Sequence, residues 1–125
     1  MSQNTFHAVS NFFTGLGESA AAQKELARYD QTILFHIGNE QPFCIRIAGG
    51  KVSPEIGGAT DKIESVDDFL RLLLLKTDAE TIAALMAGSV TLGETLLQGT
   101  VDIHGNIQKE YIIAWLSRLF QRTER

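Results

Sequence analysis

The 125-residue chain has little cysteine, little positive charge and no long apolar run. Cys44 is its one cysteine, so no disulfide can form within the chain. Its 11 Lys and Arg residues against 15 Asp and Glu residues give a net charge of -4, and this balance argues against nucleic acid as a partner, because phosphate binding needs an excess of cationic side chains. Its most apolar run, Leu72–Leu75, is far shorter than the roughly 20 residues of a membrane-spanning helix.

The motifs of common enzyme classes are absent as well. The sequence has no G-x-S-x-G nucleophile elbow, no phosphate-binding loop, no G-x-G-x-x-G motif and no histidines or cysteines at metal-binding spacing. His104 is a candidate for acid–base work, yet it lies with Asp102 on the polar side of a predicted strand, which is typical of a solvated face. We therefore expect a protein that is not an enzyme and that uses no cofactor and no metal.

Length and composition indicate one folded domain. The chain is 44% hydrophobic and 21% charged, which is close to the average of globular proteins. No linker or repeat divides it, so we predict a single domain over residues 1–125, with a helical segment at about 4–29 and a core at about 31–120. The start of the sequence lacks the charged and apolar regions of a signal peptide, which predicts a cytoplasmic location.

The first third of the sequence has the periodicity of helices. Phe6, Val9 and Phe13 recur at helical spacing and predict a helix over 4–14. The alanine-rich segment that follows predicts a second helix over 18–29.

The next segment alternates with the period of a strand. Apolar residues occupy every second position over 33–37 and again over 43–47, and the turn residues 38–42 lie between the two runs. This pattern predicts a β-hairpin. A third short strand is predicted over 51–56, at an edge of the sheet, because Pro54 cannot donate a hydrogen bond to a neighbouring strand.

The second half of the chain returns to mixed structure. Ser65 and Asp68 resemble a helix capping box, but the leucines that follow also alternate, and we interpret the segment as a strand because a separate helix follows it. The predicted elements are a strand over 69–75, a helix over 79–87, a short helix over 91–98, a strand over 100–104 and a final helix over 107–122.

The final helix has an unusually wide apolar face. Its large apolar side chains cover an arc of about 200°, whereas a surface helix needs a stripe only a little over about 100° wide. Gln108 projects into this arc, where a buried amide needs a hydrogen-bond partner. Either a bound ligand covers the surplus, or the helix lies between two layers of the fold or in a dimer. The arc comprises Tyr111, Ile112, Ile113, Trp115, Leu116, Leu119 and Phe120.

The segment from Leu85 to Asn106 carries a family resemblance. A helix ends in Leu-x-x-Gly at Gly88, a short second helix follows, and Gly99 and Gly105-Asn106 enclose the last strand and open the last helix. In this spacing the segment resembles the C-terminal half of sterol carrier protein type 2 domains. The order of the elements over about 31–120 also agrees with that family.

The resemblance implies both a fold and a function. The implied fold is α+β, with a five-stranded, mostly antiparallel sheet, helices packed on one face, and an apolar tunnel between sheet and helices. The implied function is non-enzymatic binding, and transfer, of a lipid such as a fatty acid, a fatty acyl-CoA, a phospholipid, a sterol or an isoprenoid. By this resemblance the tunnel would be lined by Ile33, Phe35, Ile45, Ile47, Ile82, Leu85, Met86, Leu96, Gln108, Ile112, Trp115 and Leu119.

Two other functions use the same apolar residues. The surplus arc and Phe6, Phe12 and Phe13 could bind a partner protein, a second copy in a homodimer or, transiently, a membrane surface. An enzyme acting on an acyl substrate is the third choice, because no acid, base and nucleophile converge in the sequence.

Overall fold

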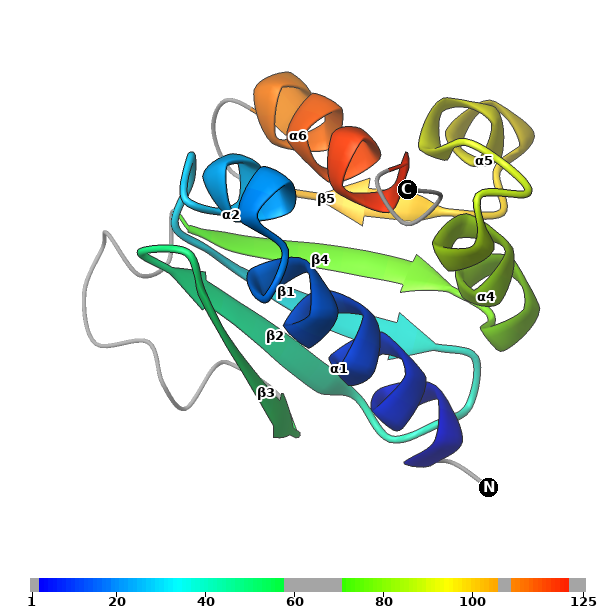
Figure 1. The fold of residues 1–125 in the computed structure, drawn as a ribbon. Coiled ribbons are helices and arrows are strands. Elements are labelled where there is room, and N and C mark those ends of the chain that lie inside the picture. The colour runs from blue at the N-terminus through cyan, green and yellow to red at the C-terminus, as the bar shows by residue number, and fades with distance from the viewer. Residues whose placement is uncertain (1–2, 58–70, 106–108, 122–125) are drawn as a thin grey trace.

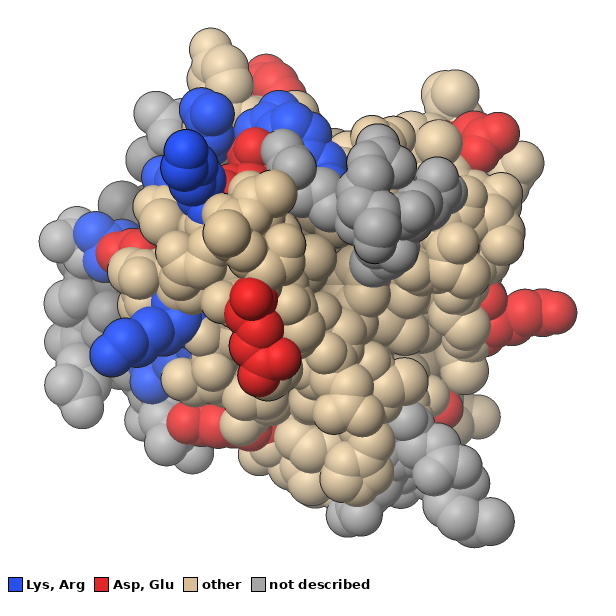
Figure 2. All heavy atoms as spheres, in the orientation of Figure 1, with Lys and Arg blue, Asp and Glu red and all other residues tan. Residues whose placement is uncertain are grey.

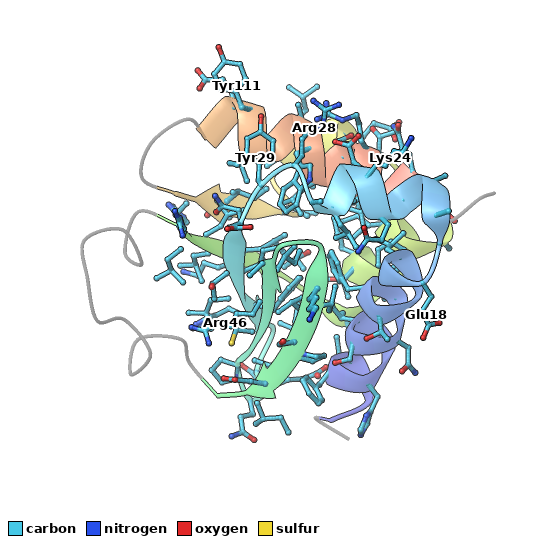
Figure 3. The ribbon with its side chains drawn as sticks, turned by 60° about the vertical axis from the view of Figure 1, so that its left-hand side comes forward. Glu18, Lys24, Arg28, Tyr29, Arg46 and Tyr111 are labelled. Atoms are coloured by element: carbon cyan, nitrogen blue, oxygen red, sulfur yellow. The ribbon has the colours of Figure 1, made fainter. Side chains whose placement is uncertain are left out.

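The computed structural model describes residues 3–57, 71–105 and 109–121, and they form a five-stranded sheet with helices on one of its faces (Figures 1 and 3). This arrangement confirms the predicted α+β fold. Within the described residues, no helix is long and apolar enough to cross a membrane. The elements in chain order are α1 (Gln3–Gly17), α2 (Ala20–Leu26), β1 (Gln31–Ile37), β2 (Phe43–Ala48), β3 (Lys51–Ile56), β4 (Leu72–Thr77), α4 (Ala79–Ala87), α5 (Leu92–Gln98), β5 (Asp102–His104) and α6 (Lys109–Gln121).

The sheet has the order β3-β2-β1-β4-β5 and is mostly antiparallel, as predicted. Strands β1 and β2 form the expected hairpin, and β3 and β5 also pair with antiparallel neighbours. The exception is β4, which lies parallel to β1 in the centre of the sheet. Pro54 belongs to the edge strand β3, where its missing N–H leaves no ladder hydrogen bond unmade toward a further strand.

Alternation along β1 and β2 separates the two faces of the sheet. Ile33 pairs with Ile45, and Phe35 pairs with Phe43, whose ring stacks on that of Phe35 at a centroid distance of 5.0 Å. These side chains are fully buried against the helices. Arg46, which follows Ile45 in sequence, points away from the helices (Figure 3). The apolar residues at every second position of β1 and β2 therefore form the buried face of the sheet.

Local capping explains where the helices of the second half begin and end. The Asp78 carboxylate accepts a hydrogen bond from the Thr81 N–H at 2.7 Å, so α4 begins there, and Gly88 ends it at a φ of 78°. Thr91 and Glu94 form a capping box at the start of α5, and Gly99 ends that helix at a φ of 79°. The predicted bounds of the helix over 79–87 are confirmed. The predicted strand over 69–75 corresponds to β4, which begins at Leu72 and continues to Thr77, while residues 69 and 70 lie outside the described residues.

The first two helices differ in length from the prediction. Helix α1 continues to Gly17 instead of ending at 14, since Gly15 lies within a helical turn. Helix α2 begins after the cap Ser19 and ends at Leu26, so the predicted helix over 18–29 was too long at both ends. Tyr29, beyond the end of α2, instead packs its ring edge-on against Trp115 at 5.6 Å.

The turn between β2 and β3 offers a matched pair of glycines for a stability test. Gly49 and Gly50 have φ values of +60° and +80°, and a Cβ at Gly50 would lie 2.7 Å from Nε2 of Gln23, whereas one at Gly49 would meet nothing within 4 Å. Gln23 Nε2 donates a hydrogen bond to the Gly50 carbonyl at 2.9 Å. Gly49→Ala should cost about 1–2 kcal/mol through backbone strain alone. Gly50→Ala should cost about 1 kcal/mol more, because Gln23 must move and lose its bond.

Urea denaturation followed by circular dichroism measures this difference. Equal unfolding free energies for Gly49→Ala and Gly50→Ala would show that the contact between α2 and this turn contributes nothing.

Candidate functional site

The wide apolar arc of α6 is covered by protein on several sides. Helix α6 contacts α2, α4 and α5 and lies over the sheet (Figure 1). Phe120 stacks against Phe12 of α1 at 5.5 Å, while Trp115 and Leu119 are fully buried. Tyr111, at the beginning of the helix, is 62% exposed and points outward (Figure 3). Packing of α6 against the sheet and against its neighbouring helices therefore accounts for most of the arc without a ligand.

A polar contact fixes α6 to α2. The indole Nε1 of Trp115 donates a hydrogen bond to the backbone carbonyl of Glu25 at 2.6 Å. The Glu25 carboxylate, only 5% exposed, accepts from Nε of Arg118 at 2.9 Å and lies 3.3 Å from Nε of Arg28. Arg28 and Tyr29 lie at the end of α2 beside α6 (Figure 3). Trp115 and Arg118 thus anchor this side of α6.

The predicted tunnel residues that the structure describes lie together in one apolar layer. Met86 and Leu96 are partly buried against the core, and Gln108 lies outside the described residues. Their contact with a ligand stays a prediction. The other predicted residues belong to the fully buried core between sheet and helices, and they are Ile33, Phe35, Ile45, Ile47, Ile82, Leu85, Ile112, Trp115 and Leu119.

A recess opens beside this layer, between the turn joining α4 to α5 and the last described turn of α6. Helices α4 and α5 lie on the right-hand side of Figure 1. Its volume is about 260 Å³. Four large apolar side chains and three uncharged polar side chains surround it, so it combines an apolar floor with hydrogen-bonding groups. Its lining residues are Leu85, Gly88, Val90, Thr91, Leu92, Ser117, Phe120 and Gln121.

A row of aromatic rings connects the recess to the interior. Phe120, which lines the recess, is 2% exposed, and its ring centroid lies 6.0 Å from that of Phe13. Phe13 lies 6.3 Å from Phe35, which stacks on Phe43 over the sheet. Phe120 therefore lies between the recess and the apolar layer that holds the predicted tunnel residues.

Charge is unevenly distributed around this part of the molecule. Figure 2 shows acidic side chains on the α4 and α5 side and a gathering of lysine and arginine on the α2 side. Helix α4 carries Glu80 and α5 carries Glu94, while α2 carries Lys24, with Arg28 just beyond its end. The recess lies on the acidic side.

Comparison with known proteins rests on structure alone. No family model matches the sequence, and no curated protein matches it. A UbiJ-SCP2 ubiquinone synthesis protein superimposes with a TM-score of 0.68 at 11% identity, covering 94% of both chains. A crystal structure of sterol carrier protein 2 gives a TM-score of 0.62 at 11% identity, covering 94% of this chain and 95% of the other. The chain has the sterol carrier protein 2 fold.

The same fold occurs inside a larger protein. The sec-alkylsulfatase Pisa1 from a Pseudomonas species matches with a TM-score of 0.56 at 16% identity over 78% of this chain, but only 13% of the sulfatase is covered. The sterol carrier protein 2 fold is therefore found both as a protein of this chain's length and as one part of an enzyme. The family resemblance of the segment from Leu85 to Asn106 is confirmed at the level of the fold.

Sequence reasoning missed the polar side of the recess in this sterol carrier protein 2 fold. Leu85 is the one predicted tunnel residue that lines it. Ser117 and Gln121 lie one helical turn apart on α6, next to its apolar arc, and such polar neighbours of an apolar stripe are usually solvated. The signal that could have found them is their spacing, since residues four apart on a helix share one face.

His104 does not form a site among the described residues. Its Nε2 lies 3.5 Å from the Asp102 carboxylate, but both side chains are exposed on the edge strand β5. No group of three or more metal-ligating side chains was found in the described ranges. His104 and Asp102 have the geometry of a solvated pair.

Proposed function

We propose that the protein binds a lipid reversibly, without chemical change and without a cofactor, with its apolar part between the sheet and the helices. The observation that carries this proposal is the recess whose floor, Phe120, is also part of the continuous apolar core. The candidate ligands are fatty acids, fatty acyl-CoA, phospholipids, sterols and isoprenoids. The neighbours described as sterol carrier proteins and as a ubiquinone synthesis protein support a lipid ligand in general.

Binding a long lipid requires the core to rearrange. The recess of about 260 Å³ is smaller than the roughly 300–1,000 Å³ of typical ligand sites. Met86 is partly buried against the core, and its unbranched side chain adapts to irregular neighbours at low cost. The lipid would replace contacts between apolar side chains, and it would gain about 25 cal/mol for each Å² of apolar surface that leaves water.

Transient contact with a membrane belongs to the same proposal, because a lipid has to leave a bilayer to reach the protein. Leu97 on α5 is 91% exposed and gives this helix an apolar tip, on the same side of the fold as the recess. A single leucine provides weak and reversible binding, as transfer requires.

Native mass spectrometry after incubation with a mixed lipid extract tests the proposed function. We expect masses that correspond to one retained lipid, and the same sample under denaturing conditions should show the unmodified chain, since nothing is covalently attached. A protein that stays uniformly empty at lipid excess would contradict the proposal.

A further inference from the structure

We infer that the recess between α4, α5 and α6 receives an uncharged, oxygen-bearing head group, such as an alcohol, and selects neutral lipids over anionic ones. This inference rests on the proposed function and narrows its ligand class. Fatty acids, acyl-CoA and phosphorylated isoprenoids would then be poor ligands, while sterols and long-chain alcohols would be good ones.

The described lining of the recess supplies hydrogen bonds but no charge. Ser117 offers a hydroxyl, and Gln121 offers both a carbonyl oxygen and an amide, so an alcohol can donate to one group and accept from another. Thr91 also lines the recess, although its hydroxyl oxygen already accepts from the Glu94 N–H at 3.1 Å. An uncharged head group therefore finds partners for its donor and its acceptor.

The described segment from α4 to β5, which forms one side of the recess, disfavours an anion. Residues 77–108 contain four acidic residues and neither lysine nor arginine. The Glu94 carboxylate accepts a hydrogen bond from the Thr91 N–H at 2.8 Å, which holds a negative charge at the rim of the recess. Helix α4 ends at Ala87, next to Gly88 of the recess lining. The C-terminal end of a helix carries a partial negative charge.

Two features that would attract an anion are partly engaged. The start of α5 has four N–H groups without a partner inside the helix, and the capping box of Thr91 and Glu94 uses two of them. Arg118 follows Ser117 on α6, yet its Nε is bonded to the buried Glu25 carboxylate at 2.9 Å on the α2 side. Because an unpaired charge in an apolar site is costly, a carboxylate or phosphate head group would weaken binding.

Matched lipid pairs test the selectivity, since each pair shares one apolar part. The pairs are oleyl alcohol with oleate, cholesterol with cholesterol sulfate, and farnesol with farnesyl phosphate, each titrated at pH 8 as competitors of a pyrene-labelled long-chain alcohol. We expect the neutral member of any pair that binds to bind at least about tenfold more tightly. Equal or tighter binding of the anionic member would overturn the inference and leave lipid binding intact. No binding by any of the six, or by the probe, would contradict the proposed function itself.

A charge substitution in the recess provides a second test of the head-group selectivity. Gln121→Lys places an ammonium group at the lining and should raise the affinity for oleate about tenfold relative to oleyl alcohol. Gln98→Lys is the matched control, because it adds the same charge on the exposed surface at the end of α5, outside the lining. An identical alcohol-to-oleate ratio in both variants would show that the head group lies elsewhere and overturn the inference.

Discussion

Replacing Trp115 with alanine is expected to destabilise the fold by about 3–5 kcal/mol, the range for truncating a large buried aromatic residue. The side chain is 0% exposed and belongs to the core between sheet and helices. Its Nε1 also donates to the Glu25 carbonyl at 2.6 Å, so the substitution leaves that acceptor without its partner and separates α6 from α2. Domains of this size have only about 5–15 kcal/mol of stability, so the loss is a large part of the total.

Urea unfolding followed by far-ultraviolet circular dichroism is the suitable measurement, because Trp115 is the only tryptophan and its fluorescence disappears with it. Trp115→Phe keeps an aromatic ring but has no N–H donor. Its free energy of unfolding should lie between those of the wild type and Trp115→Ala. Tyr111→Ala, one turn earlier and 62% exposed, should stay within about 0.5 kcal/mol of the wild type. If Trp115→Ala cost less than Tyr111→Ala, the indole would have no structural role in joining α6 to α2.

The elements that sequence predicted well are those fixed by neighbouring residues. Helix α4 is bounded by Asp78 and Gly88, two side-chain and backbone signals that act within one turn. The hairpin of β1 and β2 follows from alternation on each side of one turn. Both depend on contacts between residues that are close in sequence.

Contacts between residues far apart in the chain could not be predicted from the sequence. The parallel pairing of β1 with β4 joins segments about 40 residues apart, and nothing in the alternation of either strand specifies its neighbour. The width of the α6 arc was correctly recognised, but its cover was not identifiable, because Trp115 meets Glu25 across 90 positions of sequence. A wide apolar face alone cannot distinguish helix packing from ligand binding.

The same difference between local patterns and long-range contacts applies to the candidate site. Ile33, Phe35 and Leu85 are buried in the core, because apolar burial follows local periodicity. The recess depends on how the end of α6 meets the turn between α4 and α5, so its polar residues, Ser117 and Gln121, gave no recognisable motif. Leu85 and Phe120 belong to both the core and the recess, and they connect the two halves of the proposal.

Filling the recess with Ser117→Trp is expected to abolish most lipid binding while the protein stays folded. Ser117 is half-buried and faces the recess, so an indole at this position would occupy much of a volume of about 260 Å³ and cover Phe120. Overpacking should cost about 1–3 kcal/mol of stability. The affinity for the pyrene-labelled alcohol should fall at least about tenfold, which corresponds to about 1.4 kcal/mol.

The control for this substitution lies on the same helix. Ala114→Trp adds the same side chain at an exposed position that does not line the recess. It should leave the affinity within about twofold of the wild type, since surface substitutions away from a site change little. Circular dichroism establishes that each variant is folded, and Gln121→Trp, at the exposed edge of the lining, replaces Ser117→Trp if that variant unfolds. Unchanged affinity in a folded Ser117→Trp or Gln121→Trp protein would mean that lipid reaches the core by another route. Lost affinity in these variants but not in Ala114→Trp would place the bound lipid in the recess, because the two groups of variants differ only in where the indole points.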